Sequence, residues 1–301
     1  MSEIKVSVSE LITFMRDPLR WKFRYIDRRV PRREPVALAV GTLWHHFLET
    51  RELGGSVEQA LARVSQELDT RLTYMRASGW LDDADKLEKE YGIIAAAGPL
   101  WVDSPPVETL HVETALERRL EKNYGDERFG DLYYTLVGTP DRVVRHNGAL
   151  WHVQNRSLSP STPMALYLDC AERDLHERVY AWLIQHAFPG ERYAGTMFDI
   201  LRKLSPKSII ATPSAAMGRH FVPINPALVA DAISEIGSIL EVMTMVRTED
   251  LRPWSNPTLD KGLYGNSRDA YTDVLLGRVS LHDDAYFMDA VDRYEPVAPE
   301  A

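Results

Sequence analysis

The dipeptide Asn147-Gly148 constrains the fold of this chain more than any other feature of its sequence. It separates two runs rich in Val, Tyr, Trp and Thr, residues 133–145 and 150–157, and both runs predict strands. An Asn-Gly pair between two such runs is a strong signal for a two-residue hairpin turn, because both turn positions need a positive φ. We therefore expect an antiparallel hairpin that turns at these two residues.

The two-residue turn decides which side chains of the hairpin are neighbours. It places Asp141 opposite Gln154, with Cβ atoms roughly 4.5–5.5 Å apart. Strand alternation puts Arg156 on the same face as Gln154. A bulge at Pro140 would shift this register, and an acid facing a glutamine in a hairpin is, taken alone, more often structural. If the register holds, the turn gathers a carboxylate, an amide and a cation into one cluster.

The three groups of this cluster match the needs of phosphodiester hydrolysis. A carboxylate is a good ligand for a hard divalent cation such as Mg²⁺, and the bound ion activates water and neutralises charge on phosphate oxygens. A nearby positive group stabilises the transition state. Asp141 is therefore a candidate metal ligand, Gln154 can offer a carbonyl oxygen, and Arg156 can contact a phosphate.

The rest of the chain predicts an α/β fold. Helical periodicity covers residues 40–52, 83–97, 169–186 and 226–246, and Ser7 and Ser56 are expected to cap further helices. Strand-like composition covers residues 109–120 and 193–201 as well as the hairpin. We expect a single domain over residues 1–301, with a helical insertion at 53–106 and a C-terminal cap at 247–301.

Composition excludes several classes of protein. The chain of 301 residues is 45% hydrophobic and 26% charged, which is typical of a globular protein. No apolar run approaches the roughly 18 residues that span a membrane, and the N-terminal sequence lacks a secretory signal. We expect a soluble cytoplasmic protein without a membrane partner.

The net charge of −9 argues against a general binder of polyanions, but one short stretch is strongly basic. Between residues 16 and 33 lie Arg16, Arg20, Lys22, Arg24, Arg28, Arg29, Arg32 and Arg33. This basic strip is either a solvated helix face or a local phosphate-binding surface. In the second interpretation, Arg20, Arg24 and Arg28 contact nucleic acid.

Several motifs together resemble the PD-(D/E)XK nucleases of the RecB-like branch. Gly138-Thr139-Pro140-Asp141 followed by Gln154-Asn155-Arg156-Ser157 resembles their core, a glycine and an aspartate followed by a strand ending in acid-any-lysine-threonine. The helix start at residues 7–18 and the sequence Gly41-x3-His45-x2-Leu48-Glu49 resemble the upstream motifs. His176-x3-Tyr180 resembles their glutamine-x3-tyrosine helix. The motifs span most of the chain in the family's order.

The resemblance implies a mixed sheet flanked by helices and a nuclease that acts on DNA, on linear ends or single strands, in recombination or repair. It implies a site for Mg²⁺ or Mn²⁺ with His45, rather than its neighbour His46, beside Asp141 and Gln154 as ligands; Glu113, on the strand before the hairpin, is a further candidate. His176 and Tyr180 would contact the nucleic acid. Such proteins without a fused helicase resemble phage and CRISPR-associated nucleases, so the expected setting is the cytoplasm of a bacterium or phage-infected host.

Three departures from the family pattern bear on function. Residues 256–277 resemble a region that holds an iron–sulfur cluster in many relatives, but the single cysteine, Cys170, cannot supply four thiolates, so we expect no cluster. Gln154 replaces an acid, and Arg156 replaces a lysine, which keeps the charge but changes its geometry. These replacements leave open an exonuclease attenuated or inactivated by Arg156 and a non-catalytic relative that binds DNA ends or a partner protein. A fold unrelated to nucleases, with a merely structural hairpin, is the third alternative.

Overall fold

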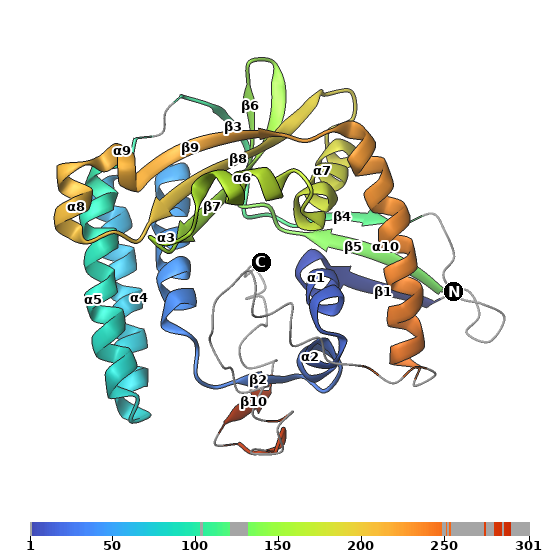
Figure 1. Ribbon diagram of the computed structural model, residues 1–301, viewed down its shortest axis with the longest axis horizontal. Helices are drawn as coiled ribbons and strands as arrows, with labels where there is room; N and C mark the ends of the chain where they lie inside the picture. The colour runs from blue at the N-terminus through green and yellow to red at the C-terminus, as the bar shows by residue number, and fades with distance from the viewer. Residues whose placement is uncertain are drawn as a thin grey trace, which may run out of the picture. The chain divides into compact units, whose positions relative to one another are not determined.

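In this computed structural model, the described residues are 2–102, 105–120, 132–248, 251, 253, 274, 280–284 and 286–289. Backbone contacts divide the chain into two compact units. Figure 1 shows the helices and strands of both, with the chain coloured by residue number. The first unit combines residues 1–34, 118–137 and 233–301, and the second combines residues 35–117 and 138–232. The motif residues of the hairpin and of the helices at His45 and His176 all fall in the second unit.

A five-stranded mixed sheet forms the centre of the second unit. Its order is β3 (Glu108–Val112), β6 (Arg142–His146), β7 (Ala149–Leu158), β8 (Tyr193–Arg202) and β9 (Met217–Pro223). Only the β7–β8 pair is parallel. The predicted hairpin is confirmed: Asn147 and Gly148 have φ values of 50° and 69°. Arg142 pairs with Val153 and His146 with Ala149, in the expected register and without a bulge.

Helices cover both faces of this sheet, as strand alternation dictates. Phe198 and Ile200 of β8 pack against α6 (Met164–Ala171), and Thr196 of the same face contacts α7 (Leu175–Ala187). Leu201, on the opposite face, joins a core formed mainly by α3 (Val36–Glu52), α4 (Val57–Ala77) and α5 (Leu81–Ala97). The short elements η2 (Gly98–Leu100), α8 (Pro206–Ala211) and α9 (Pro213–Ala216) complete this unit. The predicted mixed α/β fold is confirmed.

The first unit contains two small sheets and the N-terminal helices. Strand β1 (Ser2–Ser7) runs parallel to β5 (Leu132–Gly138), which also pairs with β4 (Leu116–Arg119). Strand β2 (Arg29–Pro31) pairs with β10 (Phe287–Asp289). Helices α1 (Val8–Arg16) and α2 (Pro18–Trp21) and the π-helix η1 (Lys22–Ile26) follow β1, and Ser7 caps α1 as expected. Helix α10 (Pro226–Arg247) begins in the second unit and continues into the first.

Three of the expected continuous elements are interrupted. The run 109–120 divides into β3 and β4, and the run 133–145 divides into β5 and β6. Pro140 lies in the break between β5 and β6, where it has no N–H for a ladder hydrogen bond. The expected helix 169–186 is two helices, α6 and α7. The region compared with iron–sulfur domains, 256–277, lies outside the described residues except for residue 274, and most of the expected cap 247–301 lies outside them too.

Candidate functional site

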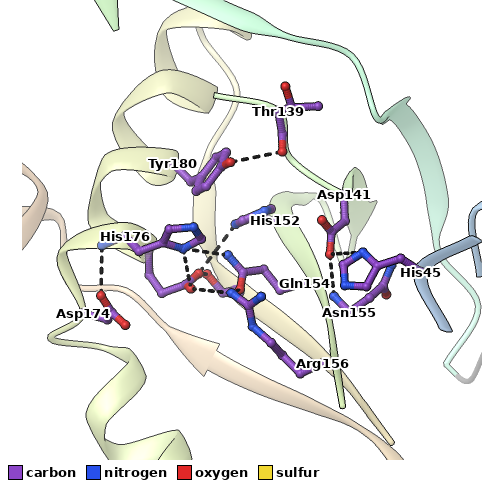
Figure 2. A network of polar contacts seen from close by, with 12 residues as sticks. His45, Thr139, Asp141, His152, Gln154, Asn155, Arg156, Asp174, His176 and Tyr180 are labelled. Atoms are coloured by element: carbon purple, nitrogen blue, oxygen red, sulfur yellow. Dashed lines mark hydrogen bonds and ion pairs between the residues drawn. The ribbon is translucent and has the colours of Figure 1, made fainter. Parts of the chain in front are cut away.

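Asp141 lies at the point where the hairpin ladder ends. It precedes β6, whose last pair with β7 is Arg142–Val153. Beyond that pair, the backbone N–H of Asn155 donates a hydrogen bond of 2.7 Å to Oδ2 of Asp141. The carboxylate thus takes the place of the missing strand partner. This contact holds Asp141 against β7 at Asn155, where a ladder pair with Gln154 was expected (Figure 2).

Glu113 reaches the same place from β3, although not from within the strand as expected. The β3–β6 ladder ends at Val112–Arg142, and Glu113 follows it with a positive φ of 43°. This conformation is uncommon for a residue other than glycine. The Glu113 N–H donates to the carbonyl oxygen of Asp141 at 3.2 Å, so the chain turns sharply and sets the two acids side by side.

His45 is brought to the acids by α3. A Cβ built on Gly41 would lie 3.5 Å from Oγ of Ser157, so the helix runs close to β7 one turn before the histidine. Nδ1 of His45 lies 3.7 Å from Oδ2 of Asp141. The side chains of His45 and Asp141 are partly exposed, at 30% and 18%, so both remain accessible from solution.

These three residues, His45, Glu113 and Asp141, form a cluster that fits a divalent cation. One potential ligand atom from each, an imidazole nitrogen and two carboxylate oxygens, lies within 4.8 Å of the others. Carboxylates suit Mg²⁺ and Mn²⁺, and neutral imidazole is a common metal ligand. The donor set therefore matches the expected cofactors, and we call it the ligand cluster.

The electrostatics of the ligand cluster also suit a cation. Glu113 is exposed as a whole residue, but the pKa of its carboxyl is raised to about 8, first because the protein around it displaces water and then because Asp141, Glu49 and Glu52 are negative neighbours. Crowded carboxylates disfavour each other's ionisation. A positive ion among them would reverse this effect.

Gln154 and Arg156 lie on the face of β7 that meets α7, as strand alternation predicted (Figure 2). Oε1 of Gln154 accepts a hydrogen bond from Nη2 of Arg156. Nε2 of Gln154 lies 3.1 Å from Nδ1 of His176. Gln154 is buried, whereas the Arg156 side chain is 34% exposed. The residues at the family's acid and lysine positions therefore contact each other directly.

Arg156 keeps its charge in this setting. Burial lowers the pKa of its guanidinium, but Tyr167, Glu177 and Asp141 raise it more, and the net shift is upward. The group cannot give up a proton and acts as a fixed positive charge.

Tyr180 and His176 both face β7 from α7. The Tyr180 hydroxyl donates a hydrogen bond of 3.1 Å to the carbonyl oxygen of Thr139, two residues before Asp141 (Figure 2). Burial raises the pKa of Tyr180, and Asp141 raises it further. The hydroxyl therefore keeps its proton and anchors the loop that carries Asp141.

The basic strip belongs to the first unit, and its members differ in their surroundings. Arg29 is buried, with Nη2 2.7 Å from Asp284, and Lys22 pairs with Asp27 at 2.7 Å. These two side chains are structural. Arg28 is exposed and has a positive φ of 52°, while Arg20 and Arg24 are partly exposed.

Two functional candidates were not predicted from the sequence, Glu177 and Asn155. Glu177 is buried on α7 and contacts His152, His176 and Thr196. A local signal was available, since an acid at position 177 interrupts the apolar face formed by Tyr180, Ala181 and Ile184. Asn155 contributes its backbone N–H, and no side-chain pattern marks that role.

Comparison with known proteins gives one family match. The family described as the PD-(D/E)XK nuclease superfamily matches residues 5–224. No curated protein matches the sequence. Among the described residues, no helix is long and apolar enough to cross a membrane.

Two solved structures are similar to the chain at low sequence identity. One is the crystal structure of a "Putative exonuclease" from Eubacterium rectale, with 10% identity and a TM-score of 0.45, covering 90% of this chain and 92% of that one. The other is the crystal structure of SSO0001, with 11% identity and a TM-score of 0.35, covering 82% of this chain and 78% of that one.

Proposed function

The chain belongs to the PD-(D/E)XK nuclease superfamily, and on that premise we propose that it is a metal-dependent nuclease that hydrolyses DNA from an end. We assign it to the RecB-like branch, of the phage or CRISPR-associated kind, because its motifs follow that order along the chain. The observation that carries the proposal is the ligand cluster, three donor atoms within 4.8 Å of one another beside the Gln154–Arg156 pair.

Each residue of the site has a proposed role. His45, Glu113 and Asp141 hold Mg²⁺ or Mn²⁺, and Gln154 adds its carbonyl oxygen when Arg156 turns from it to a phosphate. When bound, the ion supplies activated water and neutralises charge on the phosphate. Arg156 stabilises the transition state electrostatically. Tyr180 fixes the Asp141 loop, and His176 and the strip residues Arg20, Arg24 and Arg28 contact DNA.

The test is degradation of end-labelled linear DNA in EDTA, Mg²⁺ or Mn²⁺, with closed circular DNA in parallel. We expect product only from linear DNA and only with metal. Asp141→Asn keeps an acceptor for the Asn155 N–H but loses the charge, and it should slow cleavage at least about 10²-fold. Glu191→Gln, at an exposed ion pair with Arg145, is the matched control and should cleave like the parent. Cleavage in EDTA, or equal cleavage by Asp141→Asn, would refute the assignment.

A second candidate function is end binding without hydrolysis. The hydrogen bond from Arg156 to Gln154 favours it, because Arg156 occupies the carbonyl oxygen that Gln154 would offer to a metal ion. Under this alternative, fluorescence anisotropy would show tight binding of linear DNA by protein that leaves the same DNA intact with Mn²⁺. Cleavage in that mixture would exclude the alternative.

A further inference from the structure

Glu177 is a charged side chain in the buried face of α7. Its side chain is 3% exposed, and a carboxylate this deep is costly to bury unless it is paired and hydrogen-bonded. Its surroundings meet that condition. Burial alone would raise the pKa of Glu177, but contacts with His152 and His176 lower it more, so the carboxylate is ionised.

The two oxygens of Glu177 have different partners. Oε2 accepts a hydrogen bond of 3.0 Å from the Thr196 hydroxyl and lies 3.6 Å from Nδ1 of His152, both buried residues of the sheet. Oε1 lies 3.2 Å from Nδ1 of His176 and 4.0 Å from Nη2 of Arg156. One oxygen therefore fixes the carboxylate to the sheet, and the other faces the partly exposed side chains of the candidate site.

Arg156 needs a counter-charge that its strand does not supply. Its Nη2 donates to Gln154, which is neutral, and hydrogen bonds to a charged acceptor are about twice as strong as those to a neutral one. Tyr167 is a further hydrogen-bonding partner of the guanidinium, but neither an amide nor a tyrosine hydroxyl offers the full negative charge of a carboxylate. The negative oxygen 4.0 Å away, Oε1 of Glu177, lies on a different element, and Thr196 holds the same carboxylate through its other oxygen.

We propose that Glu177 is the positioning residue for Arg156: its buried carboxylate provides the negative charge that position 154 lacks and holds the guanidinium beside Gln154. The proposal rests on the proposed function only for its effect on cleavage. The positioning itself can be observed in a protein that cleaves nothing.

The primary experiment is therefore NMR of the Arg156 guanidinium in the full chain, with its signals assigned by their absence from Arg156→Lys. A held guanidinium rotates slowly about its Nε–Cζ bond and gives separate Nη signals, whereas a released one gives an average. We expect separate signals in the parent and averaged signals in Glu177→Gln. Glu191→Gln removes a carboxylate from Arg145 instead and should leave the Arg156 signals separate.

The second experiment relocates the charge. Glu177→Gln should lower kcat about tenfold to 10²-fold, the scale of loss caused by misplacing a catalytic group, with KM for DNA changed less than about twofold. Gln154→Glu places a carboxylate next to Arg156 on β7. In that background, Glu177→Gln should lower kcat less than about threefold, because the effects of substitutions at contacting sites are not additive. A merely structural role for Glu177 predicts an equal loss in both backgrounds.

Separate Arg156 signals in folded Glu177→Gln, or equal losses of kcat in both backgrounds, would overturn the proposal. If the parent cleaves nothing while its signals average in Glu177→Gln, the positioning role stands and the proposed function fails. If Glu177→Gln does not fold, Glu177→Asp replaces it, because it keeps the charge but withdraws the carboxylate. Partial averaging in Glu177→Asp supports the role, and parent-like signals contradict it.

Discussion

Arg156 is the residue whose chemistry most affects what this chain can do. Its planar guanidinium donates to Gln154 and so occupies the carbonyl oxygen that could bind a metal. Lysine at this position would be shorter and would carry a compact charge able to sit beside an attacking water. Arginine therefore keeps the electrostatics of a nuclease site while changing which atoms are available.

We predict that Arg156→Lys raises the rate of linear DNA cleavage, by about 10²-fold or more, the usual value of one well-placed transition-state donor. Initial rates with Mn²⁺ measure the effect. Arg145→Lys, the same change at a partly exposed arginine that pairs with Glu108 and Glu191, should leave the rate unchanged. A lower rate in Arg156→Lys would show that arginine itself supports catalysis at this position. An inert variant that still binds DNA would favour the non-catalytic alternative.

Glu113 gives the stability of the metal-free protein a defined pH dependence. Its carboxyl ionises near 4.5 in the unfolded chain and near 8 in the folded one, so the folded state binds more protons between these values. The free energy of unfolding should therefore fall as the pH rises from about 4.5 to about 8. Glu113→Gln cannot titrate and should lose this part of the slope in urea unfolding at several pH values, whereas Glu191→Gln should keep it. A parent-like slope in Glu113→Gln would contradict a raised pKa of Glu113 in the folded chain.

The sequence predicted some of these residues and not others for a physical reason. Hairpin register places Asp141, Gln154 and Arg156 from one turn dipeptide, because strand alternation is rigid over such short distances. Glu113 was placed on a strand, and its positive φ follows from a turn that only the β3–β6 pairing reveals. Glu177 meets Arg156 from a separate helix, and no local pattern reports that contact.

Among the elements, the β6–β7 hairpin determines the register on which the ligand cluster depends. Both turn residues, Asn147 and Gly148, have positive φ, as a type I′ turn requires. A left-handed conformation costs an ordinary L-residue roughly 1–2 kcal/mol, and only glycine adopts it freely.

We predict that Gly148→Ala lowers the free energy of unfolding by about 1–2 kcal/mol, measured by urea denaturation. Nothing lies within 4 Å of a Cβ built on Gly148, so the cost comes from the backbone conformation and not from a clash. Gly92→Ala is the matched control: Gly92 lies within α5, where its Cβ would make an ordinary 3.6 Å contact with Pro206. Alanine should be neutral or stabilising there, by up to about 1 kcal/mol. Equal effects of the two substitutions would argue against a strained turn.

Local sequence patterns predicted the positions of the strands along the chain. They did not predict which sheet each strand joins. Residues 109–120 and 133–145 have the composition of strands throughout, yet each run contributes one strand to the five-stranded sheet and one to the sheet of β1. Composition reports the fit of a side chain to a pleated surface. The partner strand is decided by packing between distant segments, so β1 and its parallel pairing with β5 were not predicted.

At the scale of the whole molecule, the first unit is assembled from three separate stretches of sequence, 1–34, 118–137 and 233–301. A boundary between units that are built from separate stretches is not indicated by a single linker of distinct composition. The basic strip lies in this unit. Lys22 and Arg29 are engaged in structural ion pairs. Of the six basic residues that remain in the strip, Arg20, Arg24 and Arg28 are the three proposed to contact phosphate.

The salt dependence of DNA binding shows whether this local charge outweighs the net charge of −9. Each phosphate contact adds about 0.9 to the slope of log affinity against log salt. Replacing Arg20, Arg24 and Arg28 together with glutamine should therefore flatten the slope by about 2–3, measured by anisotropy with labelled DNA in Ca²⁺. The control variant has glutamine in place of Lys86, Lys89 and Lys207, which are all exposed in the second unit. It changes the net charge by the same amount. If the net charge governs DNA binding, both triple variants will bind DNA more weakly by the same factor. That result would contradict the prediction and make the strip a solvated face. If the strip contacts phosphate, only the arginine variant will lose slope, because counterion release reports the charges that touch DNA and not the sum over the molecule.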